Sequence, residues 1–122
     1  IVEGHPSIEN LYLGGCRGGA VDGYEMLQMI MTAGRNKLKL VDLNLSENDI
    51  STGGDTFISD FLAGNPILEW LNLSSNQLDD NDAIAIAGAL KHNTHLCTLD
   101  LRYNRKMTGA GWAALRKAEF DD

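Results

Sequence analysis

The chain has 122 residues, of which 43% are hydrophobic, a length and composition that suit one domain with a small core. Its formal net charge is −7 and its isoelectric point is about 4.8, so we expect neither nucleic acid nor an anionic membrane as its main partner. No apolar run approaches the length of a membrane span, and the sequence contains no signal peptide. The acidic charge favours another protein, with a basic surface, as partner.

One pattern dominates the sequence and occurs four times. Its apolar residues occupy positions 1, 4 and 6, and an asparagine occupies position 9 of the last three copies. The copies begin at Ile8, Leu40, Leu68 and Leu96, so the last three follow one another at intervals of 28 residues. A fixed period of this length indicates one supersecondary unit stacked on copies of itself.

The first copy is the least regular. It carries Cys16 in place of the asparagine, and 32 residues separate its start from that of the second copy. We expect the four extra residues in the glycine-rich turn 14–19 and a helix over about 24–33. The turn lacks the Gly-Lys-Ser/Thr ending of a phosphate-binding loop, so we interpret it as a strand-to-helix connection.

Each copy predicts a short strand followed by a sharp turn. Leucines at positions 4 and 6 alternate with polar residues, which is the pattern of a strand with one buried face. An asparagine amide carries both donors and acceptors, so it can satisfy backbone groups that have no partner in the turn. We therefore expect a buried asparagine ladder formed by Asn48, Asn76 and Asn104.

A helix is predicted in the second half of each of the last three copies. The alanine-rich stretch 82–90 is the clearest, and Asp79 and Asp80 before it are acidic capping candidates. The matching stretches are 57–62 and 111–119. We expect the first two of these three helices to end at the segments 64–66 and 91–93.

The motif Leu-x-x-Leu-x-Leu-x-x-Asn resembles the leucine-rich repeat family, in its ribonuclease-inhibitor-like subtype, over residues 8–120. The resemblance implies an α/β solenoid, a short horseshoe segment of about four repeats, with a parallel sheet on the concave face and helices on the convex face. The repeats are approximately 8–39, 40–67, 68–95 and 96–122, within a single domain of residues 1–122. Lys106 departs from the motif, and as an inserted residue it would let Met107 fill the apolar slot.

The ends of the stack have no dedicated polar cap in the sequence, and the chain begins with Ile1, so we expect a piece of a longer protein. Exposed end strands predict a monomer or weak self-association through those ends. Cys16 and Cys97 fall three strand steps apart, about 14 Å, which is too far for a disulfide. Unpaired cysteines are typical of a reducing compartment, which predicts a cytoplasmic or nuclear location.

Positions 3 and 5 of each strand face away from the core, and positions 7 and 8 follow at the edge. Trp70 is an apolar side chain at a central outward position, as in interface hot spots, although it could pack on its neighbours and bind nothing. For Tyr12 and Tyr103, nearer the ends, we favour packing on neighbouring residues over partner binding. For the charged residues we favour simple solvation by water. The predicted partner-binding residues are Trp70, Tyr12, Tyr103, Asp42, Asn44, Glu47, Asn72, Asp100 and Arg102.

The sequence has no arrangement typical of catalysis. His92, His95 and Cys97 have a zinc-like spacing but lack an evident fourth ligand. No serine belongs to a recognisable histidine and acid arrangement, and an open stack lacks the enclosed pocket usual for small-molecule chemistry. We predict no enzymatic activity, no metal and no cofactor.

The preferred function is a protein–protein interaction module that binds a partner through the concave face of the sheet. A first alternative is a regulator of an enzyme, because such repeats resemble those of the Ran GTPase-activating protein and of the inhibitor of ribonucleases. No activating or inhibiting residue maps onto this chain. A second alternative is a structural segment of a longer array, such as the sensor region of a NOD-like receptor.

Overall fold

The computed structural model describes residues 10–12, 28 and 40–117. Its sheet has four parallel strands in sequence order: β1 (Asn10–Tyr12), β2 (Asp42–Asn44), β3 (Trp70–Asn72) and β4 (Thr98–Asp100). Equivalent positions of neighbouring repeats pair in register, so Leu43 of β2 lies opposite Leu71 of β3, which lies opposite Leu99 of β4. The predicted parallel sheet is confirmed, and each repeat adds one strand to it.

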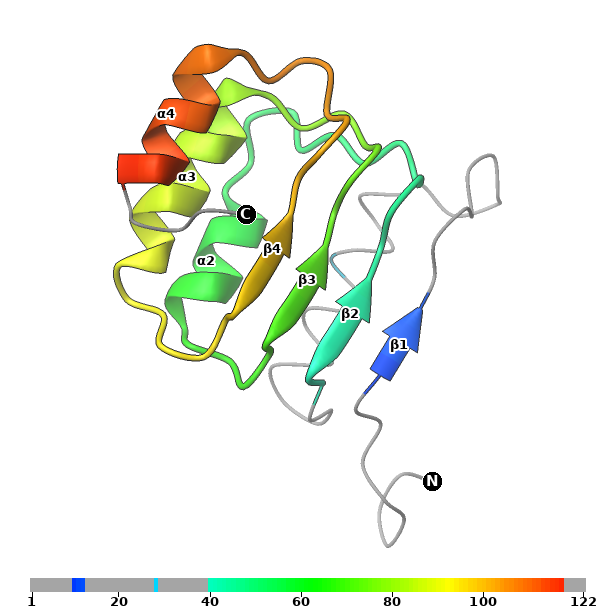
Figure 1. Cartoon of the computed structure of the whole chain (residues 1–122), viewed down its shortest axis with the longest axis vertical. Helices are drawn as coiled ribbons and strands as arrows, with labels where there is room; N and C mark the ends of the chain where they lie inside the picture. Colours follow the sequence, from blue (N-terminus) through cyan, green and yellow to red (C-terminus); the bar gives the residue numbers. More distant parts are fainter. Residues whose placement is uncertain (1–9, 13–27, 29–39, 118–122) are drawn as a thin grey trace, which may run out of the picture.

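The helices of the described residues lie on one side of the sheet (Figure 1). They are α2 (Phe57–Ala63), α3 (Asp80–Leu90) and α4 (Gly109–Lys117). The predicted helices are confirmed, although α3 and α4 each begin two residues earlier than predicted. Several predictions concern residues outside the described ranges: the turn 14–19 with Cys16, and residues 118–119 of the last helix. The helix expected over 24–33 also lies outside them, apart from Gln28.

The start of α3 has the capping arrangement that its acidic residues predict. Asp79 is the N-cap, and its carboxylate accepts from the backbone N–H of Asp82 at 3.1 Å. Asp82 in return accepts from the backbone N–H of Asp79 at 3.0 Å. This reciprocal pair satisfies two backbone donors that a helix start leaves without partners. Asp80, the other predicted cap, is the first helical residue and binds the next repeat instead.

The core lies between the sheet and the helices. The leucines at motif positions 4 and 6 are almost completely buried, with at most 2% of their surface exposed from Leu43 to Leu101. Burial of one such side chain stabilises the fold by about 1.5–3 kcal/mol. In the last repeat Met107 is 8% exposed and packs in this core, while Lys106 is exposed. The insertion at Lys106 is thereby confirmed.

The asparagine ladder joins successive turns. The amide oxygen of Asn76 accepts from the backbone N–H groups of Asn48 and Ile50, both at 2.9 Å. Its Nδ2 donates to the carbonyls of Leu45 and Leu73 at 3.0 Å. Asn48, Asn76 and Asn104 are 3%, 6% and 3% exposed, so these bonds lie in the core. Each asparagine therefore supplies partners that the sharp turn removes from the backbone.

Candidate functional site

The face of the sheet opposite the helices carries an open groove of about 250 Å³, here called the concave groove. All four strands contribute to it, and its residues come mainly from the two outward positions of each strand, with Leu71 at the base. Parallel register brings these positions into two rows across the sheet. The groove is lined by Tyr12, Asp42, Asn44, Trp70, Leu71, Asn72, Thr98 and Asp100.

Two aromatic side chains stand in this groove. Trp70 is 52% exposed and lies in register between Asp42 of β2 and Thr98 of β4. Tyr12 is 60% exposed, and its hydroxyl donates to Oδ2 of Asp42 at 2.8 Å. This hydrogen bond, followed by burial and the nearby negative charge, raises the pKa of Tyr12 above its ordinary value. Asp42 therefore holds the Tyr12 hydroxyl in the groove that Trp70 also lines.

Two asparagines occupy the middle of the groove. Oδ1 of Asn44 accepts from the backbone N–H of Ser46 at 3.0 Å. Oδ1 of Asn72 accepts from the N–H of Ser74 at 2.9 Å and from its hydroxyl at 2.7 Å. These bonds fix both amide planes, because only the oxygen can accept from a backbone N–H. Within the described part of the chain, neither Nδ2 group has an acceptor, so both can donate to a ligand.

The far end of the groove holds an ion pair. Arg102 Nη2 lies 2.8 Å from Asp100 Oδ2, and Arg102 Nε lies 3.0 Å from Asp100 Oδ1. The backbone N–H of Arg102 also donates to this carboxylate at 3.0 Å. The Arg102 hydrogen bonds hold the pKa of Asp100 below its ordinary value. This bidentate geometry keeps both side chains in one orientation.

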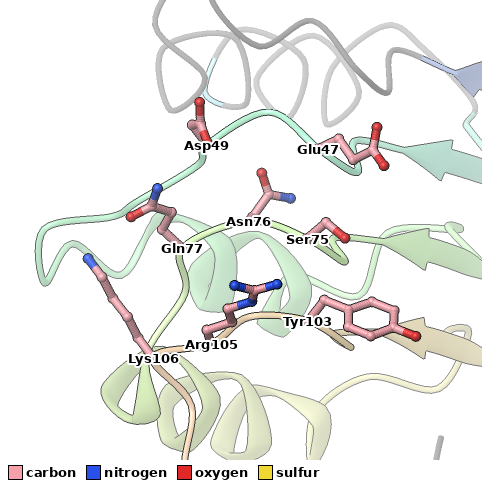
Figure 2. Close-up of a pocket in the computed structure, with 8 residues that line it drawn as sticks. All are labelled: Glu47, Asp49, Ser75, Asn76, Gln77, Tyr103, Arg105 and Lys106. Atoms are coloured by element: carbon pink, nitrogen blue, oxygen red, sulfur yellow. The ribbon is translucent and has the colours of Figure 1, made fainter.

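A second hollow of about 550 Å³ lies beyond the strand ends, where the chain turns at the asparagines. We call it the turn pocket (Figure 2). It spans the turns that follow β2, β3 and β4. Its lining residues are Glu47, Asp49, Ser75, Asn76, Gln77, Tyr103, Arg105 and Lys106.

The backbone of the turn pocket has a repeating left-handed residue. Glu47, Ser75 and Tyr103 have φ values of 60°, 57° and 65°, and each directly precedes a ladder asparagine. This conformation is uncommon for residues other than glycine and is rarer still for a bulky side chain. The turn needs it so that the next residue can point its amide into the core. The side chains at this position consequently line the pocket in a row.

The predicted partner-binding residues divide between the two hollows. Six of the nine line the concave groove, and Arg102 is tied to it through Asp100. Glu47 and Tyr103 line the turn pocket instead, so Tyr103 does not join Trp70 and Tyr12 in one groove. Residues such as Gln77 and Arg105 were not predicted. The signal for them was present, because motif position 10 is polar in all three regular repeats.

Two of the three residues with zinc-like spacing, His95 and Cys97, make side-chain contacts of another kind. Nδ1 of His95 lies 3.0 Å from Oδ1 of Asn65, and the Cys97 thiol lies 3.5 Å from the carbonyl oxygen of His95. Within residues 10–12, 28 and 40–117, no group of three His, Cys, Asp or Glu side chains could hold a metal ion. Over the same residues, no helix has the length and apolar character needed to cross a membrane.

Comparison with known proteins identifies the repeat. The family model described as "Leucine Rich repeat" matches residues 64–87 and 92–115. Leiomodin-2 of Gallus gallus is 40% identical over 78 residues, which is 64% of this chain and 14% of leiomodin-2. The chain thus spans about one seventh of that relative's length. No solved structure matches the sequence. Together with the parallel strands and the helices on one side of the sheet, these matches show that the chain is built of leucine-rich repeats.

Proposed function

We propose that this protein is a protein–protein interaction module whose concave groove binds a partner protein. The observation that supports the proposal most directly is the exposure of Trp70, 52% of its surface, at the centre of an open groove. Solenoids use extended concave faces of this kind for binding. Exposed tryptophans surrounded by polar groups are enriched among the residues that dominate binding energy.

The neighbours of Trp70 support the same proposal, because they are already held in place. Tyr12 bonds to Asp42, Asp100 bonds to Arg102, and the amide of Asn72 is fixed by Ser74. Immobilising a flexible side chain on binding costs about 0.5–1.5 kcal/mol. A surface whose side chains are fixed beforehand avoids most of that cost.

The chemistry of the groove favours a basic partner. Asp42 and Asp100 flank the strand that carries Trp70, and the chain as a whole has a net charge of −7. An arginine or lysine stacked on an indole gains about 0.5–2 kcal/mol, and neighbouring carboxylates add to the attraction. The free Nδ2 groups of Asn44 and Asn72 would donate to backbone carbonyls of the same partner.

Two further features of the chain are part of the proposal. The 28-residue period and the helices of up to eleven residues support the ribonuclease-inhibitor-like subtype. The exposed thiol of Cys97 supports a reducing, intracellular location. We infer a binding role and no catalytic one, because the leucine-rich repeats provide a scaffold of the kind that solenoids use for binding.

The proposal is tested by affinity capture from a lysate of the source cell, with wild-type and Trp70→Ala chains run side by side. Ile84→Ala is the matched control, because Ile84 is 51% exposed but lies on α3, on the helical side. Each variant is first checked for an unchanged circular dichroism spectrum. A partner that is lost with Trp70→Ala and kept with Ile84→Ala supports the concave groove.

The affinity of the captured partner is then measured by calorimetry. Trp70→Ala should weaken binding by about 2 kcal/mol or more, which corresponds to about thirtyfold in Kd. Asp42→Asn should weaken it less, because a single exposed charge contributes about 0.2–1 kcal/mol. A partner that binds wild type and Trp70→Ala with the same Kd would exclude the concave groove as its binding site.

A further inference from the structure

The turn pocket has a graded charge from one repeat to the next. The second repeat contributes Glu47 and Asp49, two carboxylates. The last repeat contributes Arg105 and Lys106, two cations. Neutral Ser75 and Gln77 of the repeat between them separate these two walls: Figure 2 shows Arg105 and Lys106 extending toward this middle turn, with Glu47 and Asp49 beyond it.

One of the two cations is present because of the irregularity in the repeat. In the two preceding repeats the apolar slot after the asparagine is filled by Ile50 and Leu78, both 0% exposed. In the last repeat Met107 fills that slot, which leaves Lys106 exposed next to Arg105. A regular motif would have placed one cation at this wall. The insertion doubles its positive charge while Met107 still packs in the core.

Glu47 and the two cations of this pocket do not neutralise one another. Two strand spacings, about 10 Å, separate the backbone of their turns. Over the residues that the structure describes, Glu47, Arg105 and Lys106 form no salt bridge, whereas Asp100 and Arg102 in the adjacent groove do. The pocket therefore presents Glu47, Arg105 and Lys106 to solvent as separated charges.

We propose that the turn pocket binds an extended segment of a partner protein that carries one acidic and one basic side chain. The acidic side chain pairs with Arg105 and Lys106, and the basic one pairs with Glu47. A polyproline II segment is extended, has three residues per turn and rises about 3.1 Å per residue, so side chains three residues apart lie on one face, about 9 Å apart. The ring of Tyr103, 68% exposed, forms the apolar side of the cationic wall.

This surface is distinct from the concave groove, because the two hollows share no lining residue. Its test is a titration of the ¹⁵N-labelled chain with acetyl-Glu-Ala-Ala-Arg-amide and acetyl-Arg-Ala-Ala-Glu-amide, the two possible directions. The comparison peptide is acetyl-Glu-Arg-Ala-Ala-amide, which has the same composition but adjacent charges. The titration is run at about 0.01 M salt, where the Debye length is about 30 Å and screening is weak.

We expect saturable shifts of the Ser75, Asn76 and Gln77 amides with one of the spaced peptides, and at least about fivefold weaker binding of the comparison peptide. The double variant Arg105→Gln, Lys106→Gln should weaken binding of the spaced peptide by about fivefold, since it removes surface charge pairs. Glu47→Gln should weaken it by about twofold. Arg116→Gln with Lys117→Gln on α4 is the matched control, because it changes the net charge equally, outside the pocket.

Equal affinities of the spaced and adjacent-charge peptides would overturn the proposal, and so would equal weakening by the two double variants. Sodium phosphate is titrated as a separate probe. Two results together would identify a simple anion site and contradict the two-charge proposal. Phosphate would saturate the shifts of the same amides, and Glu47→Gln would bind the spaced peptides as tightly as wild type does. Shifts confined to Leu71 and Asn72 would place the peptide in the concave groove and also contradict it.

Discussion

The carboxylate of Asp80 accepts hydrogen bonds from both the backbone N–H and the hydroxyl of Thr108, at 2.7 and 2.6 Å. It also accepts from the N–H of Gly111 at 3.1 Å. Thr108 immediately precedes α4, so a residue of α3 supplies the N-terminal cap of the next helix. Stacking of the repeats is thus encoded in the helix starts as well as in the strands.

The first prediction concerns acid stability. The Thr108 hydrogen bonds hold the pKa of Asp80 below its ordinary value of 3.8. The charged form is therefore favoured in the folded state, so its contribution is present above the unfolded-state pKa and is lost as the pH falls through the folded-state pKa. Asp80→Asn should lose less free energy of unfolding between pH 5 and pH 3 than wild type, measured by urea denaturation. A profile parallel to wild type would contradict this.

A neighbouring carboxyl has the opposite behaviour and must be separated from Asp80. Burial is the main cause that raises the pKa of Asp82, which is 8% exposed and accepts from the Thr52 hydroxyl at 2.5 Å. Its charged form is disfavoured in the folded state, so it lowers the free energy of unfolding at high pH. This loss is relieved as the pH falls through the raised pKa and the carboxyl takes up a proton. Asp82 is present in both proteins, so its contribution cancels when the pH profile of the free energy of unfolding of Asp80→Asn is subtracted from that of wild type.

The second prediction concerns Gly111, where α3 and α4 approach closely. A Cβ added there would lie 2.5 Å from Oδ1 of Asp80 and 3.1 Å from Cβ of Ala83. Gly111→Ala should therefore lower the free energy of unfolding by about 1–3 kcal/mol, as overpacking does. In the Asp80→Ala background the same change should cost less, because the nearest clashing atom is gone. Additive effects in the double variant, measured by urea denaturation, would disprove the coupling.

The third prediction compares two ladder asparagines. Asn76 serves backbone groups on both sides, including Asn48, Ile50 and Leu45. Asn76→Ala should lower the free energy of unfolding by about 3 kcal/mol or more, because each buried group left without a partner costs about 1–3 kcal/mol. Asn104→Ala at the last described turn should cost less. Chemical denaturation measures both, and the reverse order would contradict the ladder interpretation.

The fourth prediction concerns the Tyr12 and Asp42 pair in the concave groove. The hydrogen bond to Asp42 is the main cause that raises the pKa of Tyr12. Asp42→Asn should bring the pKa of Tyr12 closer to its ordinary value of 10.0, followed by the Cζ chemical shift of the selectively labelled ring. Because Tyr12 is 60% exposed, its substitution by Phe should leave the free energy of unfolding almost unchanged.

Much of the fold follows from the sequence because its pattern is periodic. Leucines spaced for one buried strand face, repeated every 28 residues, leave few ways to stack the units. The role of Asn76 followed from the needs of a sharp turn, and the burial of Met107 followed from the apolar slot. Each of these inferences depends only on local pattern and on repetition, which a single sequence displays directly.

Contacts between repeats were harder to predict from the sequence. Asp80 reads as a cap of its own helix, yet it caps α4, because the packing of α3 against α4 places Thr108 beside it. Asn65 and Asn93 form a second link between turns: Asn65 accepts from the N–H of Thr94 at 2.9 Å, and Asn93 donates to the carbonyl of Leu62 at 2.9 Å. Their spacing of 28 residues was visible, but their partners depend on how the turns stack.

The sequence by itself determined the repeat, its strands and helices, its core and the outward position of Trp70, because these follow from the period and the alternation of side chains. Only the tertiary structure decided which outward residues share a surface. Tyr12 and Trp70 line the concave groove, whereas Tyr103 lines the turn pocket with Glu47. The physical reason is that the residue before each ladder asparagine has a left-handed backbone, which turns its side chain away from the sheet face. The register between strands then determines which side chains of adjacent repeats lie next to one another.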